Sequence, residues 1–191
     1  MDILEIKDLE TLAQKRVPKM FFDYVNSGSW TETTYNENIS DFQKIKLRQR
    51  VAIDMSNRTL ATKMVNQSVS MPVAIAPTGL TGMQRADGEI LAAQAAEEFG
   101  IPFTLSTMSV CSIEAVAEKT KKPFWFQLYV MKDKKFMARL IDRAKEAKCS
   151  ALVLTLDLQI LGQRHKDVRN GLSTPPKLIP KHIYQVLTRP M

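Results

Sequence analysis

Four short apolar stretches alternate with amphipathic segments along the middle of the chain. The apolar stretches cover residues 71–76, 103–105, 123–130 and 151–157. Between them, residues 87–99, 112–118 and 132–147 carry apolar side chains at helical spacing. Strands and helices that alternate in units of about 25 residues predict a parallel sheet with helical crossovers, which is an α/β fold. A doubly wound sheet and a (β/α)8 barrel both satisfy this pattern.

The amino-terminal part follows a different pattern. Residues 8–25 have apolar positions at helical spacing, and Pro18 is expected to begin a second helix. Gly28 is the expected cap at the end of that helix. From residue 31 to residue 70 polar and apolar residues alternate without a repeat, which indicates an extended arm.

Apolar residues along this arm are Ile45, Leu47 and Val51. The pattern therefore divides the chain into three parts. We expect amino-terminal helices and an arm over residues 1–70, an α/β segment over residues 71–160, and a basic loop or disordered tail over residues 161–191.

Polar residues stand where each predicted strand ends. Gln127 and Tyr129 are two residues apart in the third apolar stretch, so their side chains share one face of the sheet. The other polar strand ends are Pro77-Thr78-Gly79, Ser106, and Thr155 with Asp157. In a barrel the carboxyl ends of parallel strands meet at one mouth, so these residues predict a site there. Taken alone, Gln127 and Tyr129 are explained as well by backbone hydrogen bonding and core packing.

The net charge of +7 indicates affinity for anions, and the excess is greatest after residue 164. No run of basic residues is interleaved with aromatic residues, so the sequence does not indicate nucleic-acid binding. No Gly-x-Gly-x-x-Gly or Walker sequence follows a predicted strand, which argues against dinucleotide and P-loop folds. No spacing of ligand residues indicates a metal site.

Features of the sequence favour the cytoplasm as the compartment. The start of the chain is too acidic for a signal peptide, and the apolar runs are too short to span a membrane. Cys111 and Cys149 form no Cys-x-x-Cys pair. Both cysteines are therefore expected to be reduced.

Ordered motifs between Phe21 and Ser173 resemble one known family. The motifs are Ala76-Pro77-Thr78-Gly79, Leu105-Ser106-Thr107, Trp125-Phe126-Gln127-Leu128-Tyr129 and Thr155-Leu156-Asp157. They resemble the FMN-dependent α-hydroxy-acid dehydrogenases and oxidases, which include glycolate oxidase, mandelate dehydrogenase and bacterial L-lactate dehydrogenase. Three stretches of residues are most similar to the flavin-linked L-lactate dehydrogenases: Lys46-Leu47-Arg48-Gln49-Arg50, Gly82-Met83 and residues 105–111.

This resemblance implies a (β/α)8 barrel, of which the chain carries the first four βα units, with FMN across the carboxyl-end mouth. The backbone of Ala76, Pro77, Thr78 and Gly79 would lie against the flavin. Ser106, Gln127 and Thr155 would then hydrogen-bond to the polar edge of the ring. Amide and hydroxyl groups match the ring's donors and acceptors without adding charge.

The resemblance also implies roles at the substrate. Tyr24 and Tyr129 would hydrogen-bond to the substrate, and Arg164 would bind its carboxylate through a planar fork of donors. Asp157 would orient a histidine and stabilise its protonated form. Without the resemblance, Arg164 is explained as one solvated charge of a basic loop, and Tyr24 as a surface aromatic residue.

The implied reaction oxidises an L-2-hydroxy acid to a 2-oxo acid, with hydride transfer to the flavin. Quinone or oxygen would then accept the electrons, and the sequence leaves that choice open. Complete relatives are usually tetramers. In some of them the loop after the fourth strand mediates membrane association, and the basic tail would suit the anionic inner face of a membrane.

Some parts of the family's site have no counterpart in these residues. The family's proton-accepting histidine, its second substrate arginine, a lysine near the flavin and the phosphate loops all lie in later strands. His165 and His182 stand outside every matching motif, and both are interpreted as solvated or packing residues. We therefore expect that this chain alone neither oxidises lactate nor holds FMN tightly.

Three alternatives stay open. The chain is either the amino-terminal half of an L-lactate dehydrogenase, a half-barrel that acts only by associating with another chain, or a glycolate- or mandelate-oxidising relative. Another FMN barrel, such as a flavin-dependent isomerase, is disfavoured because it would not explain Tyr24, Tyr129 and Arg164 together.

Overall fold

The computed structural model describes residues 2–173, 177 and 179–189. It forms two compact units. The terminal unit comprises residues 1–55 and 160–191, and the sheet unit comprises residues 56–159.

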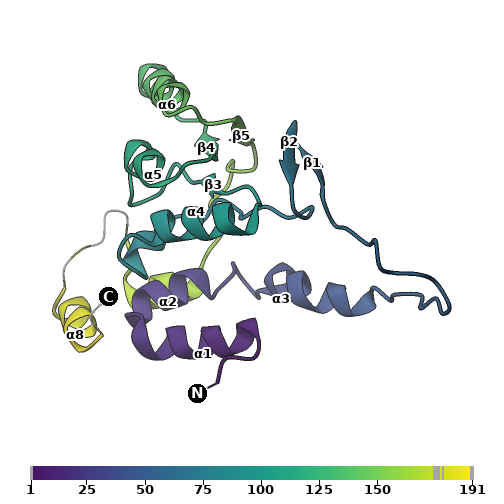
Figure 1. Ribbon diagram of the computed structural model, residues 1–191. Helices are drawn as coiled ribbons and strands as arrows, with labels where there is room; N and C mark the ends of the chain where they lie inside the picture. Colours follow the sequence, from purple (N-terminus) through teal and green to yellow (C-terminus); the bar gives the residue numbers. More distant parts are fainter. Residues whose placement is uncertain (1, 174–176, 178, 190–191) are drawn as a thin grey trace. The chain divides into compact units, whose positions relative to one another are not determined.

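Parallel strands form the centre of the sheet unit. The strands β3 (Thr104–Leu105), β4 (Trp125–Tyr129) and β5 (Ala151–Thr155) pair in that order, and both pairings are parallel. β4 and β5 pair along their whole length, from Trp125 opposite Ala151 to Tyr129 opposite Thr155. The predicted α/β arrangement with a parallel sheet is therefore confirmed (Figure 1).

The first predicted strand, over residues 71–76, forms only a single parallel bridge between Ile75 and Phe103. The Ile75 amide donates to the Pro102 carbonyl at 2.8 Å, and the Thr104 amide donates to the Ile75 carbonyl at 3.1 Å. Pro72 has no amide proton to extend the ladder. The chain nevertheless enters the sheet next to β3, as the alternation predicts.

Three helices cover one face of this sheet. They are α4 (Gly88–Phe99), α5 (Ile113–Lys119) and α6 (Lys134–Glu146), in agreement with the predicted helices, and they lie beside the strands in Figure 1. Ser112 caps α5 by accepting the Ala115 amide at 3.1 Å, and Asp133 caps α6 by accepting the Phe136 amide at 2.9 Å. The core between helices and sheet consists of Ala93, Ala96, Phe103, Leu105, Ile113, Val116, Phe124, Phe126, Leu128, Leu140 and Ala144.

A hairpin that the sequence did not predict precedes the sheet. Its strands are β1 (Thr62–Met64) and β2 (Gln67–Val69), which pair antiparallel. The two turn residues Val65 and Asn66 both have positive φ, as a tight hairpin turn requires. The side chain of Trp125 donates to Gln67 Oε1 at 2.9 Å, which ties the hairpin to β4.

The terminal unit is helical. Its elements are α1 (Ile6–Arg16), α2 (Lys19–Val25), α3 (Thr33–Ser40), the 3-10 turn η1 (Asp41–Lys44), α7 (His165–Asn170) and α8 (Pro180–Thr188). Pro18 directly precedes α2, as predicted. The predicted cap at Gly28 is wrong, because α2 ends with Asn26 as its cap. Gly28 instead lies close to Tyr35, where a β-carbon would come within 2.7 Å of the tyrosine side chain.

The two ends of the chain meet within this unit, since α2 packs against α7. The buried Asn170 donates to Asp23 at 2.7 Å across that contact. Over the predicted basic tail, residues 161–191, the structure has α7 and α8, while residues 174–176, 178, 190 and 191 lie outside the described residues. Ile45, Leu47 and Val51 of the predicted arm lie outside helices and strands and are exposed. No helix of the described chain is both long enough and apolar enough to cross a bilayer.

Candidate functional site

A row of polar side chains links the carboxyl ends of β3, β4 and β5. Gln127 Nε2 donates to Thr155 Oγ1 at 2.7 Å, and Ser106 Oγ donates to Gln127 Oε1 at 3.3 Å. The register places Gln127 and Thr155 on the same face, since Tyr129 pairs with Thr155 and Gln127 is two residues earlier. The structure thus brings together Ser106, Gln127 and Thr155, three of the residues that the sequence pattern placed at strand ends.

Thr107 extends this row, although the sequence pattern did not single it out. Its amide donates to Gln127 Oε1 at 3.1 Å, and its hydroxyl donates to the Gln127 carbonyl at 2.5 Å. The Tyr129 amide donates to the Thr107 hydroxyl at 3.3 Å. Thr107 is part of the motif Leu105-Ser106-Thr107, but a threonine after a short strand is common, so no role was predicted for it. Thr107 locks the loop after β3 onto the backbone of β4.

These bonds fix the orientation of the Gln127 amide. Oε1 accepts two hydrogen bonds, so Nε2 must face Thr155. Gln127 is 1% exposed and Ser106 is also buried, whereas Thr155 is half-buried. The Thr155 hydroxyl accepts from Gln127 and keeps its own proton to donate. The row therefore ends in an uncharged donor at the accessible end of the sheet.

The loop after Ile75 lies at the same end of the sheet unit. Ala76, Pro77 and Thr78 are exposed, and Gly79 is half-buried. The Leu80 amide donates to the Met108 carbonyl at 2.9 Å, which joins this loop to the loop after β3. An accessible backbone segment beside a row of amide and hydroxyl groups suits a flat heterocycle with mixed donors and acceptors, such as a flavin ring.

Tyr129 and Asp157 lie at the same ends. Tyr129 is the last residue of β4 and is half-buried, and its partner in the register is Thr155. Asp157 follows β5 by two residues and is exposed. Both are placed where a small substrate at the sheet end could reach them.

Tyr24 and Arg164 belong to the terminal unit, where they contact each other. The Arg164 guanidinium carbon lies 4.8 Å from the centre of the Tyr24 ring, and Nη2 donates to the Tyr24 carbonyl. Nη2 also donates to Ser27 Oγ at 3.0 Å, and Nε lies 2.8 Å from Asp167 Oδ2. Arg164 is thus an ordered residue, not a solvated charge.

The acidic partners of this cluster have shifted pKa values. Burial raises the pKa of Asp167, and the nearby Asp23 adds to that effect, while Arg164 opposes it. Burial also opposes ionisation of Asp23, but hydrogen bonds from Lys19 and Asn170 outweigh it and lower its pKa. Arg164 thus lies between the Asp167 carboxylate and the Tyr24 ring.

The two histidines belong to the terminal unit. His182 in α8 is buried, and its ring nitrogens lie 2.7 Å from the carbonyl oxygens of Lys177 and Asn170. His165 is the exposed first residue of α7. Their interpretation as packing and solvated residues agrees with these positions. Among the residues that the structure describes, no cluster of His, Cys, Asp or Glu could hold a metal ion.

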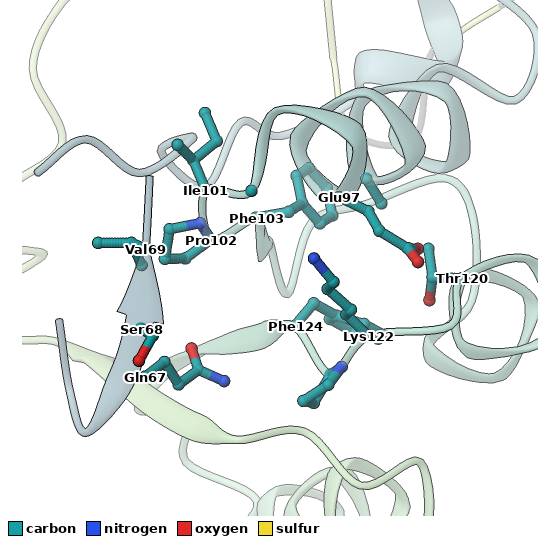
Figure 2. Close-up of a pocket in the computed structure, with 13 residues that line it drawn as sticks. Gln67, Ser68, Val69, Glu97, Ile101, Pro102, Phe103, Thr120, Lys122 and Phe124 are labelled. Carbon is teal, nitrogen blue, oxygen red and sulfur yellow. The ribbon is translucent and has the colours of Figure 1, made fainter. Parts of the chain in front are cut away.

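A cavity at the opposite end of the sheet is small. It has a volume of about 120 Å³ and lies at the amino ends of β3 and β4. Figure 2 shows Gln67 and Ser68 of β2 on one side of it and Glu97 and Thr120 on the other. Pockets for organic ligands usually occupy about 300–1,000 Å³. This cavity is therefore too small to be the site of a flavin.

Comparisons with known proteins identify relatives of this chain. The family model described as FMN-dependent dehydrogenase matches residues 13–191. An L-lactate dehydrogenase of Acinetobacter baumannii is 48% identical over 179 residues, which are 94% of this chain and 47% of that protein. An L-lactate dehydrogenase of Acinetobacter baylyi is 44% identical over 187 residues, which are 98% of this chain and 49% of that protein. The chain thus spans about half the length of these relatives.

A solved structure gives the same result for the fold. The crystal structure of the monotopic membrane protein (S)-mandelate dehydrogenase matches with a TM-score of 0.91 at 33% identity. The match covers 100% of this chain and 51% of that one. Together with the parallel sheet, it confirms the prediction of a (β/α)8-type fold of which part is present here.

Proposed function

Since the chain belongs to the FMN-dependent dehydrogenase family, we propose that it serves in the oxidation of an L-2-hydroxy acid, with L-lactate to pyruvate as the leading reaction. The observation that carries this proposal is the hydrogen-bonded row of Ser106, Gln127 and Thr155 beside the exposed loop of residues 76–79. The residues present fit the cofactor of the family, FMN. When bound, FMN supplies the acceptor for the two electrons that leave the substrate.

In this proposal the sheet end holds the flavin ring. The backbone of residues 76–79 would contact the ring, and the Thr155 hydroxyl would donate a hydrogen bond to its polar edge. Ser106 and Thr107 hold the Gln127 amide in the orientation that presents Nε2 toward that edge. Because all these groups are neutral, they orient the ring without fixing its charge.

Four residues carry the proposed substrate roles. We propose that Tyr24 and Tyr129 hydrogen-bond to the substrate, and that Arg164 binds its carboxylate through Nη1. The contacts of Arg164 to Asp167, Ser27 and the Tyr24 carbonyl are made by Nε and Nη2, not by Nη1. Asp157 would orient the imidazole that accepts the substrate's proton and stabilise its charged form.

The proton acceptor itself would come from outside these 191 residues. His182 is buried with its ring nitrogens 2.7 Å from two carbonyl oxygens, and His165 is an exposed residue outside every motif of the family. We therefore propose that the chain corresponds to the amino-terminal half of such an enzyme, and that by itself it is inactive and holds FMN weakly. It would act together with a segment that completes the barrel.

The test combines flavin binding with turnover. The purified chain is mixed with FMN and L-lactate, alone and with a chain carrying the remaining half of the Acinetobacter baylyi relative. We expect weak flavin binding and no pyruvate from the chain alone, and lactate-dependent pyruvate from the mixture. Submicromolar quenching of flavin fluorescence by the chain alone would refute weak binding. Association without turnover in the mixture would favour the alternative, a half-barrel that acts only by associating.

The same mixture addresses the finer choices. The mixture is assayed with L-lactate, glycolate and (S)-mandelate in turn. It should give its highest kcat/KM with L-lactate, because the residues of its motifs are similar to those of L-lactate dehydrogenases. A higher value with glycolate or mandelate would assign the chain to that substrate instead. Hydrogen peroxide formation would identify oxygen as acceptor, and reduction of an added quinone without peroxide would identify quinone. Sedimentation of the mixture would show whether it assembles as a tetramer.

We also propose that the chain is cytoplasmic and contacts the membrane peripherally through α8. This helix exposes Ile183, Tyr184 and Leu187 along one side, and it carries Lys181 near its start. Such a helix suits the interface of an anionic bilayer. The chain should sediment with liposomes containing phosphatidylserine, and Leu187→Asp should weaken this. Equal sedimentation with neutral liposomes, or none with either, would refute the proposal.

A further inference from the structure

Glu89 is a buried carboxylate that none of the proposed roles uses. It is the second residue of α4 and is 1% exposed. Burying a carboxylate is costly unless hydrogen bonds compensate for the lost water. A structural role in the hydrophobic core would be served better by an apolar side chain. The position of this charge therefore needs an explanation.

The Glu89 carboxylate joins two separate loops. Its Oε1 accepts the Gly82 amide at 3.0 Å and the Val110 amide at 2.9 Å. Gly82 lies in the 3-10 turn η2 (Thr81–Met83), which follows the loop of residues 76–79. Val110 belongs to the loop that follows Ser106 and Thr107. One oxygen atom thus holds together the continuations of both segments that were assigned to the flavin.

The electrostatics of Glu89 match this role. Burial opposes its ionisation, but the amides of Val110 and Gly82 outweigh burial, so the pKa of Glu89 lies below its ordinary value. Its place in the first turn of α4 also favours a negative charge. Burial and the neighbouring carboxylate raise the pKa of the Cys111 thiol, which therefore stays neutral beside Glu89.

The residues around Gly82 and Gly88 are tightly packed. A β-carbon on Gly82 would lie 2.7 Å from Val110 Cβ and 3.1 Å from Glu89 Oε2. A β-carbon on Gly88 would lie 2.9 Å from the Thr81 side chain and carbonyl oxygen. At Gly82 the first loop therefore packs closely against the side chains of Val110 and Glu89, and at Gly88 the start of α4 packs closely against Thr81.

We propose that Glu89 is a positioning residue that fixes the loop of residues 76–79 relative to Ser106, and so shapes the wall of the flavin site. This inference rests on the proposed function only where it concerns FMN. The clamp on the two loops is independent of any ligand. Glu89→Gln removes the charge that strengthens both hydrogen bonds while keeping the size of the side chain.

Amide hydrogen exchange followed by NMR tests the clamp in the chain as it is. In Glu89→Gln, the amides of Gly82 and Val110 should exchange about tenfold faster, because weaker bonds open more often. The amides of Ile75 and Thr104, which bond within the sheet, should keep their rates. Unchanged rates at Gly82 and Val110 would overturn the proposal. Equal acceleration at all four amides would also overturn it, since it would indicate lost stability without positioning.

Glu97→Gln is the matched control. Glu97 lies in the same helix and also accepts a backbone amide, that of Lys121 at 2.9 Å, but at the surface. It should leave the four amides unchanged. If Glu89→Gln does not fold, Gly82→Ala serves in its place, since the added β-carbon would stand 2.7 Å from Val110 Cβ and forces the two loops apart while the carboxylate stays. The amides of residue 82 and Val110 should then both exchange faster while those of Ile75 and Thr104 keep their rates, and protection of both would refute the clamp.

Adding FMN to the same samples separates the clamp from the proposed function. In the wild-type chain, FMN should shift the amide signals of Thr78, Gly79 and Ser106. The affinity of Glu89→Gln should be lower by about tenfold, and that of Glu97→Gln should be unchanged. Wild-type signals that do not move would count against the proposed function, and the exchange data would still decide the clamp. Equal FMN affinity despite loosened loops would overturn the link to the flavin.

Discussion

Gln127 uses both ends of its side-chain amide inside the sheet unit. Replacing it with alanine removes the bond to Thr155 and leaves the Ser106 hydroxyl and the Thr107 amide without their acceptor. Buried polar groups that lose a partner cost about 1–3 kcal/mol each. We expect Gln127→Ala to lower the free energy of unfolding by about 2–4 kcal/mol, as measured by urea denaturation followed by circular dichroism.

Gln94→Ala is the control for this prediction. Gln94 donates to the Lys119 carbonyl at 3.0 Å, but its side chain is exposed. Its loss should change stability by no more than about 0.5 kcal/mol. If the two variants unfold at the same urea concentration, the hydrogen bonds of Gln127 to Ser106, Thr107 and Thr155 do not stabilise the fold.

Among individual residues, the sequence predicted those that interrupt a hydrophobic pattern. A glutamine within the apolar run of residues 123–130 is unusual, and its period-two relation to Tyr129 set its face. Glu89 breaks no pattern, because an acidic residue in the first turn of a helix is common. The burial of Glu89 and its bonds to Gly82 and Val110 depend on loops whose paths no local pattern specifies.

Between the elements α5 and α6 lies an ion pair whose effect on stability depends on pH. Arg143 Nε and Nη2 donate to the two carboxylate oxygens of Glu114 at 2.6 and 2.7 Å. The hydrogen bond from Arg143 lowers the pKa of Glu114 to about 2. The pair therefore stabilises the fold above the ordinary glutamate pKa of about 4.3, and this contribution is lost as the pH falls toward 2.

Glu114→Gln should thus be less stable than the wild type at neutral pH and equally stable near the pH where Glu114 becomes protonated. Both side chains are largely exposed, so solvent screening limits the difference to about 0.5–1 kcal/mol. Urea denaturation at several pH values measures it. Asp142→Asn, which removes the looser pair of Asp142 with Lys145 within α6, should show a smaller effect. A Glu114→Gln deficit that is independent of pH and salt would contradict this assignment.

The elements themselves were predicted to different degrees. Helices α4, α5 and α6 were predicted well because each combines an apolar stripe with a clear cap or break. The β1–β2 hairpin was missed because Val65 occupies a turn position with positive φ, which a β-branched residue rarely adopts. The length of the first strand of the sheet, residues 71–76, was overestimated. An apolar run does not reveal how many backbone hydrogen bonds the neighbouring strand can form with it.

For the whole molecule, the apolar face of the sheet continues beyond the helices. Leu152 pairs with Phe126 and Leu154 pairs with Leu128, so all four side chains share the helix-covered face. Phe126 and Leu128 are buried, whereas Leu152 is 48% and Leu154 is 49% exposed. Within the described part of the chain, β5 pairs with β4 and with no further strand. Both an open strand edge and an adjoining apolar face favour association.

We therefore expect the chain alone to self-associate as its concentration is raised, which sedimentation velocity measures as an increase in the average sedimentation coefficient. Leu152→Lys combined with Leu154→Lys should reduce self-association, because a half-exposed lysine keeps its charge in water and repels a second copy. Leu47→Lys is the matched control, since Leu47 is 95% exposed and lies in the terminal unit. Added complementary half-barrel should suppress self-association if it covers this face of β5. A chain that stays monomeric at every concentration would show that burial of these leucines is not what completes the fold.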